Sequence, residues 1–340
     1  MHTTGWNNMA LRILKPGLLS TIQDLGRWGF QDTGVPVSGA MDRYSMQMAN
    51  MLCGNPPGVP VIEAAWHGAQ WLAESDMLLA CCGGGASLHI HGEAAPLGRP
   101  IFVPAYSLLT LEPAPHGFYT YLAVAGGFSC DRHMGSASTY VPSMLGGVGG
   151  RPLHAGQLLE TGKEKTALSR NIESSLRKGQ DLFSFPPWGI EQEAEMTDPV
   201  TIRATEGPEH AWFGEAGMQA FWQQVFSVSA RSNRMGTRLS GISIPAAMKG
   251  ELLSTAVTRG TVQVTHDGTP MILMADAQTT GGYPRIAQVT AADLSKCAQL
   301  RPGERFRFRQ ISGEEAEELY LAQERKLRQL QRSIALRYVR

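Results

Sequence analysis

Residues 274–287, MADAQTTGGYPRIA, gather more polar groups than a plain turn needs. They supply a carboxylate, an amide, two hydroxyls, two unhindered backbone N–H groups and a phenol, from Asp276, Gln278, Thr279, Thr280, Gly281, Gly282 and Tyr283. Such groups can hydrogen-bond a carboxylate, a phosphate or an amide. The alternative is a turn that satisfies itself, in which the Thr and Asp side chains bond nearby backbone.

A second polar stretch, SARSNRMGTRLSG, places Arg231, Arg234 and Arg238 close together, with Asn233 between them. Arginine suits planar anions because its guanidinium donates two parallel hydrogen bonds. The stretch therefore predicts an anion clamp, and the alternative is a solvated charged loop.

A third candidate lies in QDTGVPVSGAMDRY, where Asp42 stands near the start of an expected helix. Residues 38–40, Ser-Gly-Ala, could close a turn that faces a ligand. Asp42 could equally be a carboxylate that the helix dipole favours at a helix end.

Three other patterns lack residues that a phosphate, metal or biotin site would need. The Gly83–Gly85 run lacks the Lys-Ser/Thr of a phosphate loop. His89 and His91 are expected to share a strand face, but no third ligand is evident, so we predict no metal. Lys249 in AAMKGE lacks the hydrophobic residue expected after a biotinylated lysine, so we predict no biotin attached to this chain.

The elements that must position these residues are mostly short strands. A strand is expected from Leu11, and a helix within GAMDRYSMQMANMLCGNP. Short apolar runs broken by Gly and Pro across residues 60–160 indicate hairpins, consistent with a barrel. Further on, VTIRATEGP predicts a strand, EAGMQAFWQQVF a helix, and TVQVTHDGTPMILMAD a hairpin.

The C-terminal stretch is expected to be a helix that begins with a capping box of Ser312 and Glu315. Its apolar stripe packs either on this protein or on a partner. The sequence thus predicts a mainly β fold with some α structure. The expected order is an N-terminal extension 1–10, a first β-barrel-like domain 11–160, a linker 161–199, a second barrel 200–311 and a C-terminal helix 312–340.

Composition narrows the function classes. Lys plus Arg and Asp plus Glu both number 30, which argues against binding nucleic acid or a membrane surface. No apolar window is long enough for a membrane helix. The five cysteines have no C-x-x-C spacing, so reduced thiols and a cytoplasmic location are expected.

Several stretches together resemble a known family. They are KPGLLSTIQDLGRWGFQDTGVPVSGAMDRYSMQMANMLCGN, YLAVAGGF, GPE, SNRMGTRLSG and VQVTHDGTPMILMADAQTTGGYPRIA. They are similar to the allophanate hydrolase subunit 2, or biotin-dependent carboxyltransferase A/B-subdomain, family, from about Leu11 to Gln310. The resemblance implies cyclophilin-like β-barrel domains. Arg259 and His266 stand where small residues or proline are more usual.

The family includes the C subunit of bacterial 5-oxoprolinase and the Kip antagonist. The resemblance therefore implies a cytoplasmic, heteromeric complex with two partners, one of the Kip-inhibitor type and one of the lactam-utilisation type. That complex opens 5-oxoproline to L-glutamate with ATP, bound at a subunit interface or on a partner. One alternative is a carboxyltransferase component that moves a carboxyl group from carboxybiotin to urea or a related small amide. Another is a non-enzymatic antagonist of a kinase-inhibitor protein.

Within that resemblance, the residue types suggest roles. Catalytic roles are expected for Asp42, Arg234, Asp276 and Tyr283. Substrate or anion binding is expected for Asn233, Arg238, Gln278, Thr279, Thr280, Gly281 and Gly282. Replacing Arg234 and Thr279 together by alanine is expected to abolish turnover and leave the fold intact.

Overall fold

The computed structural model describes residues 10–162, 164–177, 181–191, 197–244, 246 and 252–338. Within that part of the chain, contacts divide the protein into two compact units. Unit 1 is built from residues 10–25, 43–191 and 327–338, and unit 2 from residues 26–42 and 197–326. The division is thus not sequential, because residues 26–42 belong with the second half of the chain. Most of the expected extension 1–10 and all of Lys249 lie outside the described residues.

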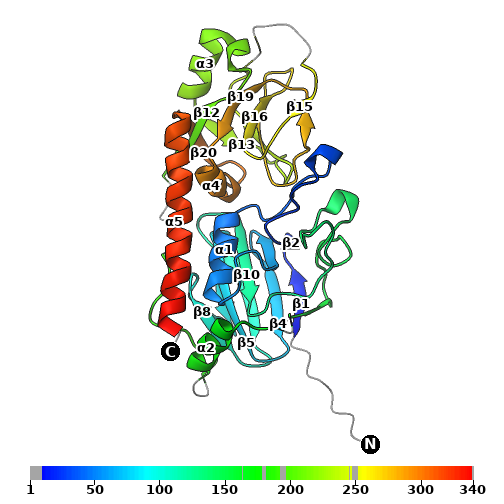
Figure 1. Ribbon diagram of the computed structural model, residues 1–340, viewed down its shortest axis with the longest axis vertical. Coiled ribbons are helices and arrows are strands. Elements are labelled where there is room, and N and C mark those ends of the chain that lie inside the picture. Colours follow the sequence, from blue (N-terminus) through cyan, green and yellow to red (C-terminus); the bar gives the residue numbers. More distant parts are fainter. Residues whose placement is uncertain are drawn as a thin grey trace, which may run out of the picture. The chain divides into compact units, whose positions relative to one another are not determined.

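Unit 1 contains two antiparallel sheets (Figure 1). The six-stranded sheet has the order β11 (Leu158–Glu160), β1 (Ala10–Pro16), β4 (Ala69–Ala73), β9 (Leu108–Pro113), β6 (Ala86–Ile90) and β7 (Glu93–Ala95). The five-stranded sheet has the order β2 (Leu19–Gln23), β3 (Val61–Ala65), β10 (Tyr119–Val124), β5 (Met77–Gly83) and β8 (Pro100–Val103). The hairpins expected across residues 60–160 therefore form parts of two sheets, where the sequence was consistent with a barrel.

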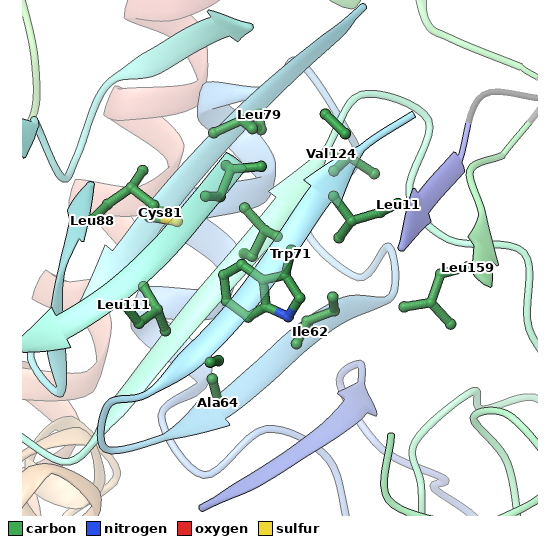
Figure 2. Packing of buried hydrophobic residues seen from close by; sticks show 14 of the residues in the cluster. Leu11, Ile62, Ala64, Trp71, Leu79, Cys81, Leu88, Leu111, Val124 and Leu159 are labelled. Atoms are coloured by element: carbon green, nitrogen blue, oxygen red, sulfur yellow. The ribbon is translucent and has the colours of Figure 1, made fainter. Parts of the chain in front are cut away.

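One apolar core joins the two sheets of unit 1. Trp71 of β4 is fully buried, and Figure 2 shows it among side chains from both sheets, including Leu11 and Ile62. The alternation of β1 explains this placement, since Leu11 and Ile13 point to one face and are both fully buried. Each such side chain contributes roughly 1.5–3 kcal/mol when it leaves water.

Two α-helices lie wholly within the described part of unit 1. Helix α1 (Arg43–Leu52) packs on β5 and β10, and it lies within the stretch where the sequence predicts a helix. Helix α2 (Ala167–Leu176) lies in the interval 161–199, where a linker is expected from the sequence. Thr166 caps α2 by accepting the backbone N–H of Ser169, and Ile172 and Leu176 are buried. That interval therefore contributes folded structure to unit 1.

Unit 2 is a closed barrel of seven strands. Their order is β12 (Val200–Glu206), β19 (Arg285–Val289), β16 (Thr261–Val264), β17 (Pro270–Leu273), β14 (Gly236–Ser240), β13 (Phe226–Val228) and β20 (Arg305–Gln310). Only β12 and β20 pair in parallel within this ring. Phe221, Phe226, Phe306 and Phe308 contact one another in its core.

Smaller elements surround the barrel. They are α3 (Gly214–Gln223), α4 (Leu294–Gln299), the two-residue strands β15 (Thr255–Ala256) and β18 (Thr280–Gly281), and the 3-10 turns η1 (Gln31–Thr33), η3 (His210–Phe213) and η4 (Ala291–Asp293). The predicted hairpin is confirmed, because β16 and β17 pair across a turn at Gly268, whose φ is +80°.

The long helix α5 (Gly313–Tyr338), red in Figure 1, confirms the predicted C-terminal helix. Its capping box is present: Ser312 N–H donates to Glu315 Oε2 at 2.8 Å, and Glu315 N–H donates to Ser312 Oγ at 3.1 Å. Leu327 and Ile334 of its apolar stripe are buried. Among the described helices, none is long and apolar enough to cross a membrane. The fold is thus mainly β with some α structure, a seven-stranded barrel and a C-terminal helix, as predicted.

Candidate functional site

Two of the polar segments meet in unit 2 through Arg234 and Asp276. Arg234 Nε donates to Asp276 Oδ2 at 2.8 Å, and Nη2 donates to Oδ1 at 3.1 Å. The backbones also join, because the N–H of Asp276 donates to the carbonyl of Arg234 at 2.9 Å. Both side chains are less than a tenth exposed. These two segments therefore meet through a buried ion pair, whereas the sequence predicted an anion clamp at the arginine stretch.

The third polar segment joins the same pair. Ser38 Oγ donates to Asp276 Oδ1 at 2.7 Å, and Arg234 Nη2 donates to the carbonyl of Gly39 at 2.7 Å. Residues 38–42, called the strap below, are all buried. Ser38 and Gly39 both have left-handed backbone conformations, with φ of +59° and +91°.

Two more side chains of unit 2 hold the rest of the strap. The Arg259 guanidinium donates to the carbonyls of Ala40 and Met41. Gln299 Nε2, from α4, donates to Asp42 Oδ2 at 2.8 Å. Asp42 is thus a buried carboxylate fixed at the end of the strap, directly before the first residue of α1.

The segment after Asp276 is held through its backbone. Strand β18 pairs with β15, and the N–H of Val257 donates to the carbonyl of Thr279 at 3.0 Å. Beneath it, fully buried Gln263 donates from Nε2 to the carbonyl of Tyr283 at 3.2 Å. A Cβ at Gly281 would lie 2.6 Å from that Gln263 nitrogen, so a larger residue there would displace the Gln263 amide. The Tyr283 ring packs edge-on against His266, with centroids 5.2 Å apart.

Three side chains of this segment make fewer hydrogen bonds than its backbone does. Thr280 is exposed, and Gln278 and Thr279 are half-buried. Among the described residues, none of these three side chains has a hydrogen-bond partner. They can therefore donate to an oxygen of a small guest, which is the property expected for an amide or carboxylate site.

Two predicted binding residues, Asn233 and Arg238, lie in a local turn and in strand β14. Asn233 Oδ1 accepts the backbone N–H groups of Met235 and Gly236, which closes a local turn. Arg238 is exposed on β14, where it lies opposite Met271 in the ladder with β17. Within the part of the chain that the structure describes, no hydrogen bond joins either side chain to residues 276–283.

A second ion pair joins two of the stretches that resemble the family, GPE and VQVTHDGTPMILMADAQTTGGYPRIA. Glu209, from the GPE stretch, accepts Arg285 Nε at 2.7 Å and Nη2 at 2.6 Å, together with the Arg285 backbone N–H. The hydrogen bond from Arg285 lowers the pKa of Glu209. Arg285 also donates to the carbonyl of Ala256 in β15. This pair therefore fixes the chain directly after Tyr283.

Sequence reasoning misses several of these residues. In the sequence, Ser38 is only part of a turn, and Gln263 is only a strand residue. Arg259 is visible as a departure from the family pattern, and its contacts with the strap give that departure a structural role. Glu209 lies in a recognised stretch, but its partner Arg285 is 76 residues away.

Among the described residues, other reactive groups do not form a second candidate site. All five cysteines are free, and burial raises the pKa of Cys53, Cys81 and Cys297, and that of Cys130 to about 11. Such thiols are poor nucleophiles. Within the described residues, no three His, Cys, Asp or Glu side chains are grouped to hold a metal ion. His91 lies beyond the end of β6 with φ of +53°, so it does not continue the strand of His89.

The glycine run of unit 1 is closely packed against a second backbone segment. A Cβ at Gly83 would meet the carbonyl oxygen of Tyr119 at 2.3 Å, and one at Gly85 would meet that of Phe118 at 2.4 Å. The backbone of residues 83–85 is therefore packed against another backbone segment. Gly84 and Gly85 connect β5 to β6, which agrees with the predicted turn.

Comparison with known proteins gives a consistent result. Residues 33–310 match the family described as carboxyltransferase domain, subdomain A and B. The chain is 37% identical over 320 residues to the C subunit of 5-oxoprolinase from Escherichia coli strain K12, covering 94% of this chain and 97% of that protein. It is 34% identical over 321 residues to the corresponding 5-oxoprolinase protein of Haemophilus influenzae, covering 93% and 96%.

A solved structure extends the comparison to a larger enzyme. The crystal structure of the K. lactis urea amidolyase superposes with a TM-score of 0.85 at 27% identity, covering 96% of this chain. This chain spans only 20% of that protein. The resemblance seen in the sequence is thus confirmed, and the chain belongs to the family of carboxyltransferase domains with subdomains A and B.

Proposed function

We propose that this protein is the C subunit of an ATP-dependent 5-oxoprolinase that opens the lactam 5-oxoproline to L-glutamate. The observation that carries the proposal is the similarity to the C subunit of 5-oxoprolinase along nearly the whole of both chains. In this proposal the chain is one part of an amide hydrolase that works as a heteromeric complex. Its two partners are a Kip-inhibitor-type protein and a lactam-utilisation-type protein.

The chemistry of the site in unit 2 supports this assignment. A lactam carbonyl is a poor electrophile, and its oxygen acquires negative charge as it attacks the γ-phosphorus of ATP. Hydrogen-bond donors aimed at that oxygen stabilise the transition state, and the loss of one can cost roughly 2.7–4 kcal/mol. The hydroxyls of Thr279 and Thr280 and the amide of Gln278 are such donors.

The buried groups beside them act differently. Because Arg234 and Asp276 bind each other, we assign them the task of holding the strap and the start of the 276–283 segment. Tyr283 closes that segment. Asp42 stays a candidate for orienting an amide N–H, through a carboxylate that Gln299 fixes.

ATP enters the proposal as a co-substrate. Transfer of its γ-phosphoryl group to the lactam oxygen releases ADP and activates the carbonyl carbon. One water adds to that carbon and the C–N bond breaks, which leaves an acyl phosphate, and a second water hydrolyses the acyl phosphate to L-glutamate and inorganic phosphate. The sequence has no Walker motif, and the glycine run of unit 1 lacks the Lys-Ser/Thr of a phosphate loop. We therefore assign the nucleotide to a partner or to a subunit interface.

A cytoplasmic location completes the proposal, since all five thiols are free.

The test is glutamate release from 5-oxoproline and ATP by the three purified proteins together. Release that disappears when this chain is omitted is the expected result. Absence of release from the complete mixture, with an intact complex shown by gel filtration, refutes the proposal.

The similarity to urea amidolyase favours one second candidate, a carboxyltransferase acting on urea or a related amide. In that case labelled bicarbonate enters the product when a biotin carboxylase and a biotin carrier are supplied. Tight binding of a kinase-inhibitor protein without turnover in either assay would instead indicate an antagonist.

A further inference from the structure

A serine occupies a position in unit 2 where the backbone favours glycine. Ser38 has φ of +59°, and Gly39 follows at +91°. Left-handed backbone is unfavourable for residues with a Cβ, and it persists in native proteins where the surroundings enforce it. Ser38 is also fully buried, so its hydroxyl requires a partner.

That partner is the carboxylate at the start of the candidate site. Asp276 Oδ1 accepts Ser38 Oγ at 2.7 Å and Arg234 Nη2 at 3.1 Å, while Oδ2 accepts Arg234 Nε at 2.8 Å. Arg234 Nη2 also reaches the carbonyl of Gly39, which closes a ring of contacts around Ser38. Arg234 and Arg259 bind carbonyl groups of the strap, whereas the Ser38 hydroxyl binds the Asp276 carboxylate directly.

We propose that Ser38 is a positioning residue, kept at a left-handed position because its hydroxyl orients Asp276 and, through it, the donors at 278–280. Asp276 is two residues before Gln278, and its backbone N–H is anchored on Arg234. A shift of the carboxylate therefore moves the segment that carries the donor side chains. The effect on turnover rests on the proposed function, but the effect on segment order does not.

The chain offers a matched control in unit 1. Met134 has φ of +52° and is followed by Gly135 at +77°, the same pair of left-handed conformations. Met134 is exposed and lies outside the candidate site. Met134→Gly relieves the same kind of backbone strain without removing a contact to Asp276.

The experiment compares Ser38→Gly, Ser38→Ala, Ser38→Thr and Met134→Gly in the full chain. Hydrogen exchange of residues 274–284 is measured on the isolated protein, because it needs no activity. We expect exchange in Ser38→Gly and Ser38→Ala to rise about tenfold or more, as for loss of a hydrogen bond to a charged group. Ser38→Thr keeps the hydroxyl and stays close to wild type, as does Met134→Gly.

Stability and turnover are then compared in the reconstituted complex. Glycine suits the left-handed backbone, so Ser38→Gly is expected to be more stable than Ser38→Ala. Both are expected to lose kcat to the same degree, about 10- to 100-fold, since both misplace the donors. If Ser38→Thr does not fold, the Gly and Ala variants still decide the matter.

Turnover that follows stability, with Ser38→Gly better than Ser38→Ala, overturns the proposal and leaves Ser38 a purely structural residue. Unchanged exchange at 274–284 in both variants also overturns it. A wild-type complex that releases no glutamate refutes the proposed function instead. The hydrogen-exchange result still tests whether Ser38 positions the 274–284 segment.

Discussion

The Arg234 guanidinium and the Asp276 carboxylate form a two-pronged ion pair that is buried in unit 2 and also binds the strap through Ser38 and Gly39. Removal of one partner leaves an uncompensated buried charge, which is costly. This changes the expectation from sequence that alanine at Arg234 leaves the fold intact.

We therefore predict that Arg234→Ala lowers the free energy of unfolding by about 3–5 kcal/mol. Replacing both partners, in Arg234→Met with Asp276→Leu, is expected to cost less than either single change, because no charge is left unpaired. Urea titrations followed by circular dichroism measure both. Arg238→Ala is the control, because Arg238 is exposed, and it should shift stability by less than about 0.5 kcal/mol. Equal midpoints for Arg234→Ala and Arg238→Ala would contradict the prediction.

Thr279 is the sharper probe of the proposed activity. Its hydroxyl has no partner among the described residues, so Thr279→Val removes a donor without leaving a buried group unsatisfied. We expect stability within about 0.5 kcal/mol of wild type and a loss of about 10²–10³ in kcat. Glutamate release by the reconstituted complex measures it. Wild-type kcat in this variant would remove Thr279 from the site.

Arg259 is predicted to hold the strap. It donates to the carbonyls of Ala40 and Met41, so Arg259→Ala should cost about 1.5–3 kcal/mol and expose residues 38–42 to hydrogen exchange. Arg259→Lys should rescue only in part, because an ammonium lacks the planar fork of a guanidinium. Arg231→Ala, an exposed arginine of the same unit, serves as the control. Strap exchange that matches this control would argue against the role.

The Glu209–Arg285 pair makes part of the stability depend on pH. The hydrogen bond from Arg285 lowers the pKa of Glu209 in the folded protein, below the value of about 4.3 expected for an unfolded chain. Its contribution is therefore fully present above the unfolded pKa and is lost as pH falls through the folded pKa. Glu209→Gln should be less stable than wild type at neutral pH, and the difference should shrink on acidification. Parallel urea midpoints from about pH 7 to pH 3 would contradict this coupling.

Local patterns in the sequence determined the elements. The alternation of β1, the β16–β17 hairpin with its glycine turn, and the capping box of α5 each depend on a few neighbouring residues, and each is present. The polar segments were found for the same reason, since clusters of donors and glycines are visible along the chain. Family resemblance added the closed barrel.

Only the tertiary structure decided how those residues are used. Nothing local shows that Asp276 receives a hydroxyl from Ser38, 238 positions earlier, or that Arg259 binds the carbonyls of the strap. Likewise, the sequence predicted that Arg234 and Arg238 belong to one anion clamp, whereas the fold buries Arg234 against a carboxylate and leaves Arg238 exposed. The physical reason is that side-chain chemistry is set by its partners and its access to water, and both depend on contacts between distant segments.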